Sequence, residues 1–427
     1  MTLVTEQGLV DPAARSWVVG ADDSGFGLQH LPLGAGASSG RVPTIWARIG
    51  DHAVNLAAAA QADLLDDPEV ADAVAAPNLN PLLALGPRAW HGLRRRLVEL
   101  LVHDGAQHLL NSLLTPVANL TMALPIDVGD YVDFYSSIEH ARNVGRIFRP
   151  DDEPLLPNWR HLPIGYHGRA GTIVVSGTEI RRPVGQRAPA ATGGPPGFGP
   201  STKLDIELEL AFVTGGPRAR VTTDEAADVV FGVALLNDWS ARDIQSWEYR
   251  PLGPFLGKSF ATSLAAWITP LAALTPFRVP QPAQDPAPLT YLAVRDDWGL
   301  DLDLEVVLST AAMRGRHAPP AVISGGNAAG LWWTIPQQLA HATVNGATTR
   351  PGDLYGTGTI SGASPGSEGS LLELANDGRA PITLPSGDQR TWLEDGDEVV
   401  LRGSAHRNGH PPLRLAEAAG RIVPTDA

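Results

Sequence analysis

Acidic side chains are concentrated in three short segments of the chain, at residues 133–140, 205–210 and 237–245. This density of carboxylates can be buried only with compensating positive charge, because an unpaired ion inside a protein is strongly unfavourable. A hard divalent cation is the simplest counter-charge. The three segments therefore predict a metal site built from oxygen ligands.

The segment 205–210 alternates acidic and apolar residues. As a strand, it places Asp205, Glu207 and Glu209 on one face. One interpretation is a half-buried strand whose acidic side faces water. The other is that Glu207 and Glu209, two residues apart and pointing the same way, form half of an oxygen cage for Ca²⁺. The remaining acidic segments favour the cage.

His140 is the candidate general base because of the residues around it. Asp133, Tyr135 and Arg149 lie close to it in the chain, so one segment offers a metal ligand, a hydroxyl group, a base and an anion clamp. Glu373 is an acid within an apolar run, where a carboxylate can orient a histidine. The alternative for Glu373 is an edge-strand residue that faces solvent.

A short helix is expected to carry the cationic and amide side chains of the site. Arg242 and Gln245 are three residues apart and project from one side of it, with Tyr249 one turn further on. Ser240 is the expected N-cap, with Asp243 three residues later in a capping-box arrangement. The alternative for Arg242 is an ordinary surface charge.

Three further residues stand where a ligand could reach them. Lys258 lies among Pro, Gly and apolar residues and needs an anion as partner. Tyr166 lies in the glycine-bounded turn 165–169, where it is either exposed or simply packed. Thr359 lies in a glycine-rich stretch that lacks the spacing of a nucleotide-binding loop, so its hydroxyl or backbone is free to contact a substrate.

The elements that must position these residues can be read from periodicity. Residues 42–56 predict a β-hairpin with a Gly-containing turn. Residues 57–65 and 89–101 predict helices, and the arginines at 94–96 are expected on a solvated helix face. Strand-like segments dominate after a boundary near 120–125, and residues 189–200 predict a long loop between two strands.

The composition is that of a folded, β-rich protein that acts on small molecules. A chain of 427 residues exceeds what one hydrophobic core usually supports, so two domains are expected. Its 45 Gly and 37 Pro favour mainly β structure with some α. The net charge of -14, without a long basic run, argues against nucleic acid and membranes as partners.

Two features that the sequence lacks, cysteine and a targeting or membrane-spanning segment, lead to further expectations. The lack of cysteine leaves oxygen and histidine ligands, which favours calcium or magnesium over zinc. The first residues show neither a signal-peptide pattern nor a membrane-spanning run, so a cytoplasmic, soluble protein is expected.

Taken together, these segments closely resemble the fumarylacetoacetase family. The resemblance rests on motifs that run in the family's order, at residues 25–32, 133–145, 162–169, 205–212, 237–249, 251–260 and 358–362. It implies a small N-terminal SH3-like barrel at 1–122, a larger C-terminal mixed β-roll domain at 123–427, and a homodimer. The implied activity is hydrolysis of a carbon–carbon bond in a diketo acid, 4-fumarylacetoacetate, to fumarate and acetoacetate, the last step of tyrosine and phenylalanine catabolism.

The resemblance also implies a role for each matching residue. Those that would hold Ca²⁺ are Asp133, Glu207, Glu209 and Asp238. Those that would lie around a structural Mg²⁺ are Asp238, Lys258 and Thr262. Those that would bind substrate are Tyr135, Arg149, Gln245, Tyr249 and Thr359, with Tyr166 as a possible neighbour.

These roles combine into a mechanistic hypothesis. His140, held by Glu373, would take a proton from a water molecule that attacks the carbonyl carbon. Arg242, Gln245 and Lys258 would stabilise the oxyanion. The leaving group is a carbanion, and the metal would stabilise its charge. Four carboxylates around a divalent ion leave two excess negative charges, so nearby cations, including Arg149, are also needed for balance.

The sequence leaves two alternatives open. One is a different C–C hydrolase or decarboxylase of the same superfamily, with the same cage and another dioxo acid as substrate. The other is a non-catalytic metal- or ligand-binding β protein, although binding alone needs neither His140 nor Glu373. Ala261, where the family commonly has glycine, and Ala265-Ala266, where Ser-Pro is usual, depart from the family pattern beside the expected Mg²⁺ site.

Overall fold

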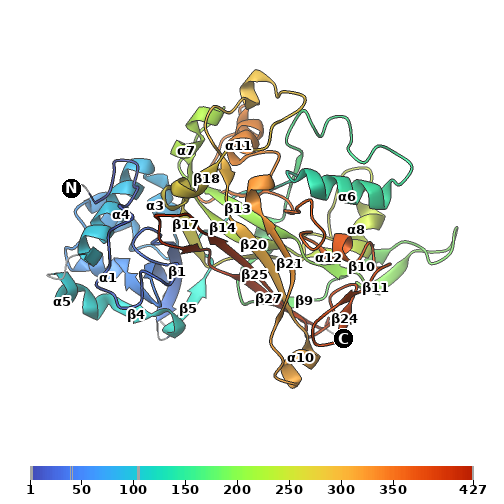
Figure 1. The fold of residues 1–427 in the computed structure, drawn as a ribbon, viewed down its shortest axis with the longest axis horizontal. Helices are drawn as coiled ribbons and strands as arrows, with labels where there is room; N and C mark the ends of the chain where they lie inside the picture. Colours follow the sequence, from blue (N-terminus) through green and yellow to red (C-terminus); the bar gives the residue numbers. More distant parts are fainter. Residues whose placement is uncertain (1–2, 39, 41, 103–105, 426–427) are drawn as a thin grey trace.

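The computed structural model describes residues 3–38, 40, 42–102 and 106–425. It consists of an N-terminal β-rich part flanked by helices and a larger C-terminal part built on two sheets (Figure 1). The prediction of a mainly β protein with some helix, with a small N-terminal and a larger C-terminal domain, is confirmed. The division between 1–122 and 123–427 stays a prediction.

The N-terminal strands form an antiparallel arrangement in the order β4-β3-β2-β1, with β5 on the other part of β1. The strands are β1 (Leu33–Ser38), β2 (Thr44–Ile49), β3 (His52–Asn55), β4 (Leu114–Pro116) and β5 (Leu120–Ala123). The predicted hairpin is confirmed as β2–β3, whose turn includes Gly50 at φ 60°. Such a positive φ suits glycine, which has no Cβ to clash with its own backbone.

Helices pack around this N-terminal sheet, and both are coloured blue to cyan (Figure 1). They are α1 (Leu56–Gln61), α2 (Pro68–Ala73), α3 (Asn80–Ala84), α4 (Pro87–Val102) and α5 (Gln107–Leu110). The two predicted helices correspond to α1 and α4. The solvated arginine face was wrong for Arg94, which is buried and donates to the carbonyl oxygens of Gly8, Gln29 and His30.

One sheet continues from the N-terminal strands into the larger part, because β1 pairs with β17. Its path beyond β1 is β17-β14-β13-β22-β6-β7, with β16 pairing both β14 and β8. The central strands β13 and β14 are buried along their whole length, as expected for a sheet covered on both faces. The strands are β6 (Tyr131–Phe134), β7 (Gly165–His167), β8 (Ile173–Val175), β13 (Leu208–Thr214), β14 (Val230–Asp238), β16 (Thr262–Leu264), β17 (Trp267–Pro270) and β22 (Leu354–Gly356).

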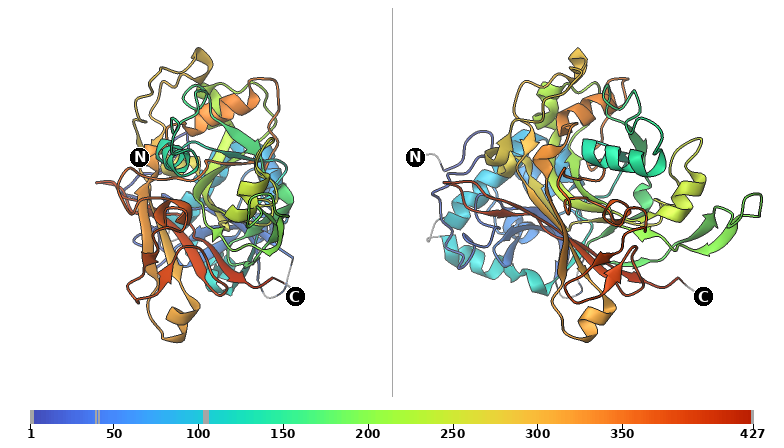
Figure 2. Two further views of the ribbon diagram at one scale, coloured as in Figure 1. Left: turned by 90° about the vertical axis from the view of Figure 1, so that its right-hand side faces the viewer. Right: turned by 45° about the vertical axis from the view of Figure 1, so that its right-hand side comes forward.

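A second sheet, in the order β21-β20-β25-β27-β9, packs against the first (Figures 1 and 2). Close packing depends on Gly420 of β27, where a Cβ atom would lie 2.5 Å from the Trp239 ring. The strands are β9 (Glu179–Arg181), β20 (Asp303–Ser309), β21 (Ala321–Asn327), β25 (Glu398–Ala405), β26 (Leu413–Arg414, paired with β25) and β27 (Ala418–Val423). The two sheets enclose a continuous apolar core.

The predicted loop at 189–200 is partly a strand. Residues Gly197–Pro200 form β11, which pairs with β10 (Val184–Arg187) in a hairpin that projects from the body (Figure 2). Polar, Gly-rich composition hid this strand, because an edge hairpin needs backbone pairing but little apolar burial. The remaining short strands are β12 (Leu204–Asp205), β15 (Ser240–Ala241), β18 (Arg278–Val279), β19 (Gly299–Leu300), β23 (Ile382–Thr383) and β24 (Gln389–Arg390).

Three helices carry residues of the site: α6 (Ile138–Phe148), α8 (Arg242–Glu248) and α12 (Leu371–Leu374). Beneath α6 lies a small separate apolar cluster that includes Trp159, Trp332 and Trp333. The other helices are α7 (Ala226–Val229), α9 (Leu271–Leu274), α10 (Ala311–Gly315) and α11 (Ile335–Thr343). No helix in the described part of the chain is long and apolar enough to cross a membrane.

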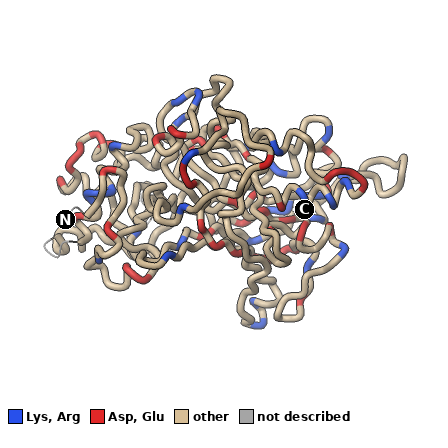
Figure 3. Tube along the Cα trace, turned by 45° about the horizontal axis from the view of Figure 1, so that its top comes forward, with Lys and Arg blue, Asp and Glu red and all other residues tan. Residues whose placement is uncertain are grey.

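Basic and acidic residues are interspersed along the chain trace (Figure 3).

Candidate active site

Four carboxylates converge where the central strands of the first sheet lie side by side. Asp133 is on β6, Glu207 directly precedes β13, Glu209 is on β13, and Asp238 ends β14. One oxygen from each carboxylate lies within 4.8 Å of the others, and all four residues are buried. The predicted ligand residues are therefore brought together.

Strand pairing explains this convergence. β13 pairs with β14, and β22 bridges β13 to the parallel strand β6, which places Asp133 opposite Gly356. A Cβ atom on Gly356 would lie 2.8 Å from a Glu209 oxygen and 3.1 Å from an Asp133 oxygen. Glycine at this position therefore leaves room for both carboxylates.

The acidic cluster fits a hard divalent cation. Asp133 Oδ1 and Glu209 Oε1 are buried and have no hydrogen-bond partner in the described structure. Burial, reinforced by the neighbouring carboxylates, raises the pKa of both Asp133 and Glu209 well above the ordinary range. Buried acceptors without donors are costly, so the all-oxygen donor set suits Ca²⁺ or Mg²⁺.

Lys258 lies against this cluster with its predicted anionic partners. Its Nζ atom donates to Glu207 and, at 2.7 Å, to Asp238 Oδ2. Burial lowers the pKa of Lys258, but the charges of Asp238 and Glu207 outweigh burial and raise it. Thr262 Oγ1 donates to Asp238 Oδ1 at 2.9 Å. Lys258 is therefore a buried ammonium group held between two carboxylates.

Tyr166 also belongs to this side of the site. It is partly buried on β7, and its hydroxyl group donates to Asp238 Oδ2 at 3.2 Å. The sequence alternative of an exposed turn residue was wrong, because β7 pairs with β6 and directs Tyr166 toward the carboxylates.

Arg242 is buried rather than a surface charge. Its Nη1 lies 2.8 Å from Glu207 Oε1, and its Nε donates to Asp205 Oδ2 at 2.8 Å. Nη1 also donates to Gln245 Oε1 at 3.1 Å. The charges of Lys258 and Arg242 overcome burial and lower the pKa of Glu207 to about 2. Glu207 is thus held as an anion by two cations.

Asp205 lies outside the four-carboxylate cluster, although Arg242 contacts both Asp205 and Glu207. The ladder breaks after β12, and the Asp205 carboxylate accepts from the backbone N–H groups of Leu371 and Leu372 at 2.7 and 3.1 Å. The water-facing alternative was also wrong, because Asp205 is completely buried.

The N-cap prediction for α8 was wrong. Helix α8 begins at Arg242, and Ser240 lies in β15, where its hydroxyl donates to Asp238 O at 2.9 Å. The Asp243 carboxylate instead accepts from Ser201 Oγ at 2.6 Å and from Thr202 N at 2.8 Å. Strand pairing of Ser240 with Asp205 competes with capping and prevails.

His140 and Glu373 are joined across the interface between α6 and α12. His140 Nδ1 lies 2.7 Å from Glu373 Oε2, and both side chains are buried. Glu373 is on a short helix, not on a solvent-facing edge strand. A carboxylate on Nδ1 holds the imidazole tautomer that leaves Nε2 free to accept a proton.

His140 and two members of the acidic cluster, Asp133 and Glu207, line one cavity of about 570 Å³. Its wall combines members of the acidic cluster, the base, two cations and all the predicted substrate residues, namely Asp133, Glu207, Tyr135, His140, Arg149, Tyr166, Arg242, Gln245, Tyr249, Lys258 and Thr359. Glu209, Asp238, Thr262 and Glu373 lie behind this wall. The cavity therefore exposes an anion, cations, hydroxyl groups and a base to the same bound molecule.

Two of the predicted substrate residues present polar atoms without partners in the described structure. Thr359 Oγ1 is buried and unpaired, and so is Arg149 Nε, although Arg149 Nη2 donates to Pro154 O at 2.9 Å. Tyr135 is partly buried and packs edge-on against His140 with ring centroids 5.2 Å apart. Tyr249 lies at the rim, where its hydroxyl accepts from Arg250 Nε at 2.9 Å.

Sequence reasoning missed two parts of the site. One is the apolar portion of the cavity wall, which includes Phe148, Leu156 and Leu252. The other is the set of polar residues around Glu373, namely Asn143, Ser361 and Ser370. A sequence signal existed for Ser370, because Ser-x-x-Glu at 370–373 is a capping pattern and Ser370 caps α12.

The site combines a cage of buried carboxylates with a histidine that a carboxylate orients. This arrangement is typical of metal-assisted hydrolases. Comparisons with known proteins identify the family. Residues 131–414 match the model of the fumarylacetoacetate (FAA) hydrolase C-terminal domain, and residues 29–125 match the fumarylacetoacetase N-terminal domain. The chain belongs to the fumarylacetoacetase family.

Curated relatives match over nearly the full length. The chain is 44% identical to fumarylacetoacetase of Rattus norvegicus over 422 residues, covering 96% of this chain and 99% of the relative. It is 45% identical to that of Caenorhabditis elegans over 428 residues, covering 96% and 100%. A solved fumarylacetoacetate hydrolase from Exiguobacterium antarcticum shares the fold at a TM-score of 0.54, with 14% identity over 92% of this chain and 99% of that one.

Proposed function

We propose that this protein hydrolyses 4-fumarylacetoacetate to fumarate and acetoacetate. The observation that carries the proposal is that Asp133 and Glu207 of the acidic cluster line the same cavity as His140, which Glu373 orients from behind. Hydrolysis of a diketo acid needs positive charge near its oxygen atoms, which a cation held by the acidic cluster would supply. It also needs a base for the attacking water, which is His140. Family membership and the relatives of the same name support this substrate.

The residues act as follows in the proposed reaction. His140, with Nδ1 on Glu373, accepts a proton from water at Nε2, and the water oxygen attacks the carbonyl carbon. Arg242, Gln245 and Lys258 line the cavity and donate to the oxyanion that forms. The bond between the attacked carbonyl carbon and the acetoacetate part then breaks. Its electron pair leaves with acetoacetate, which takes up a proton.

Substrate orientation falls to the remaining residues of the cavity wall. Arg149 and Tyr249 are suited to a terminal carboxylate, because one is a cation with a free Nε atom and the other stands at the rim. The unpaired hydroxyl of Thr359 and the hydroxyl of the partly buried Tyr135 are suited to carbonyl or carboxylate oxygens. Tyr166 is suited to a neighbouring role, since its hydroxyl already bonds to Asp238.

Calcium is the proposed ion of the acidic cluster, with Asp133, Glu207, Glu209 and Asp238 as ligands. When bound, a divalent cation supplies Lewis-acid stabilisation of negative charge on the diketone oxygens. Magnesium is proposed beside Asp238, Lys258 and Thr262. Because Lys258 is an ammonium group, it can only balance charge there, and the ligand oxygens would come from Asp238 and Thr262.

The family resemblance further motivates a homodimer, a cytoplasmic location and a role in tyrosine and phenylalanine catabolism. These three statements remain predictions. Sedimentation of the purified chain tests the first of them directly.

One assay tests the function. Fumarylacetoacetate consumption is followed for wild type and His140→Ala, each with and without a chelator. The proposal expects turnover only by the metal-loaded wild type. If the wild type is inert toward fumarylacetoacetate but cleaves an acylpyruvate, it is another C–C hydrolase of the superfamily. If it turns over neither compound, it is a non-catalytic binding protein.

A further inference from the structure

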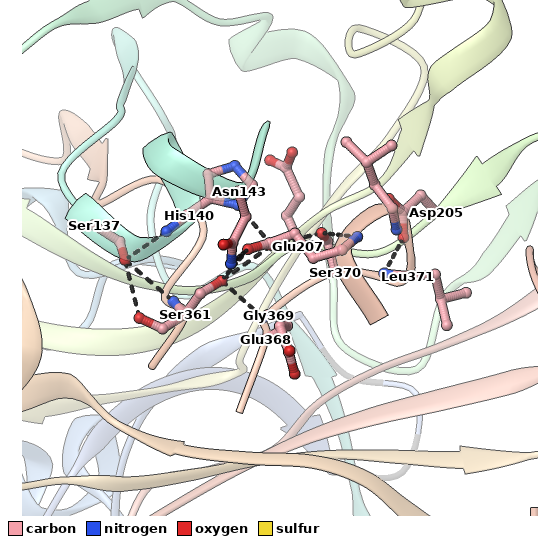
Figure 4. A network of polar contacts seen from close by, with 12 residues as sticks. Ser137, His140, Asn143, Asp205, Glu207, Ser361, Glu368, Gly369, Ser370 and Leu371 are labelled. Carbon is pink, nitrogen blue, oxygen red and sulfur yellow. Dashed lines mark hydrogen bonds and ion pairs between the residues drawn. The ribbon is translucent and has the colours of Figure 1, made fainter. Parts of the chain in front are cut away.

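Glu373 accepts hydrogen bonds from four side chains, those of His140, Asn143, Ser361 and Ser370, which Figure 4 labels. His140 Nδ1 and Ser370 Oγ each lie 2.7 Å from Oε2. Asn143 Nδ2 lies 2.9 Å from Oε1, and Ser361 Oγ lies 2.9 Å from Oε1 and 3.0 Å from Oε2. An ionised carboxylate has about four acceptor positions, so these groups occupy its capacity. Orienting a histidine requires only one of them.

Asn143 reaches Glu373 from the same helix as the base. It follows His140 by three residues on α6, so both side chains project from one face of the helix toward α12. Arg146 Nη1 donates to Asn143 Oδ1 at 3.2 Å, which directs the amide nitrogen toward Glu373. The helix therefore presents two donors to one carboxylate, one on each oxygen.

Ser361 connects three parts of the site. Its backbone is bonded to Ser137, whose Oγ donates to Ser361 O at 3.1 Å and accepts from Ser361 N at 3.3 Å. Ser137 also caps α6. Ser361 Oγ accepts from Gly369 N at 3.0 Å, so its own proton is directed at Glu373. Ser361 thus ties the start of α6 to the chain that leads into α12.

The charge state of Glu373 agrees with this geometry. Burial raises the pKa of Glu373, but the charge of His140 and hydrogen bonds from His140, Asn143 and Ser370 outweigh burial and lower it. Neither Asn143 nor Ser361 lines the cavity. Any effect of theirs on the reaction therefore passes through the residues that they contact, of which Glu373 is the one bonded to the base.

We propose that Asn143 and Ser361 are positioning residues that fix Glu373 Oε1, so that Oε2 stays on His140 Nδ1 and Nε2 stays directed at the cavity. Without the two donors on Oε1, the carboxylate can rotate about its last side-chain bond, and the imidazole loses its fixed orientation. This inference rests on the proposed function, which supplies the reaction that the base serves.

The test uses the calcium-loaded full-length protein with Asn143→Ala, Ser361→Ala, the double variant, and Arg142→Ala as control. Arg142 lies on the same helix, and among the described residues it pairs only with Glu139, at 2.9 Å. We expect each single change to lower kcat about tenfold, with KM within about twofold of wild type. The double variant should lose more than the product of the single losses, because Oε1 then has no donor.

A spectroscopic readout separates positioning from simple destabilisation. A histidine Nδ1–H proton bonded to a carboxylate gives a distinct downfield proton resonance, which Glu373→Gln assigns. This resonance should weaken or move in both single variants and remain in Arg142→Ala.

Each result either supports or overturns the positioning role of Asn143 and Ser361. It is overturned if both single variants keep kcat within about twofold of wild type, or if Arg142→Ala loses as much activity as they do. If Ser361→Ala does not fold, the half-buried Asn143 decides alone. If the wild type has no turnover, the proposed function fails, while the Nδ1 resonance in wild type and variants still supports or refutes the positioning.

Discussion

Replacing Glu209 by glutamine should stabilise the metal-free protein while abolishing its response to calcium. Glu209 lies within 4.8 Å of three other buried carboxylates, and two unit charges at that distance repel by roughly 3 kcal/mol at an effective dielectric constant of 20. The amide oxygen of the new side chain would keep the bond from Gly358 N, which Glu209 Oε2 accepts at 3.0 Å. The substitution removes a charge but little packing.

The size of the effect is bounded by protonation. A buried carboxyl group whose charge is too costly stays protonated. Keeping Glu209 protonated at pH 7, when its reference pKa is 4.5, costs at most about 3 kcal/mol of folding free energy. The pKa of Glu209 is raised in the folded state, first by burial and then by Asp133, Glu207 and Asp238. The folded metal-free protein therefore binds a proton that the unfolded chain releases, and its stability falls as pH rises above the unfolded pKa.

The assay is urea unfolding at several pH values, with chelator and with calcium. In chelator, Glu209→Gln should leave the free energy of unfolding unchanged near pH 4.5 and raise it by about 2–3 kcal/mol at pH 7. Calcium at 100 times its dissociation constant should add about 3 kcal/mol to wild type and far less to the variant. The exposed Glu153→Gln serves as control. A variant less stable than wild type in chelator, or equally stabilised by calcium, would refute the reasoning.

Three further outcomes are expected. His140→Ala should lower kcat by about 10²–10⁴ while calcium still stabilises the variant, as measured by turnover and thermal unfolding. Arg242→Lys should lose the paired contacts to Asp205 and Glu207 and destabilise the protein by about 3 kcal/mol in urea; a change below about 1 kcal/mol would contradict the buried bridge. The pKa of Glu373 is lowered on folding, so it adds stability above its unfolded pKa that is lost as pH falls; Glu373→Gln should flatten the acid side of the stability profile, and an unchanged profile would count against this.

The sequence predicted the reactive residues of the site better than it predicted the contacts that hold them in place. Local patterns revealed the acidic segments, the hairpin β2–β3 and helix α4, because these depend on neighbours in the chain. Convergence of Asp133 on Glu209 depends on β22 pairing with both β6 and β13. No spacing along the chain encodes that pairing, so only the family resemblance anticipated it.

Errors arose where tertiary contacts override local rules. Alternation grouped Asp205 with Glu207 and Glu209, but Asp205 stays outside the four-carboxylate cluster, because its carboxylate accepts from the N–H groups at the start of α12. Ser240 had the residue type of a cap, but its strand pairing took precedence. Ser361 has no local signal, since its role depends on segments distant in sequence.

The most direct measurement of the central claim is a crystal structure of the protein grown with calcium. The account predicts one calcium ion with oxygen atoms of Asp133, Glu207, Glu209 and Asp238 at about 2.3–2.6 Å. Calcium bound elsewhere, with these four carboxylates turned to separate partners, would contradict it.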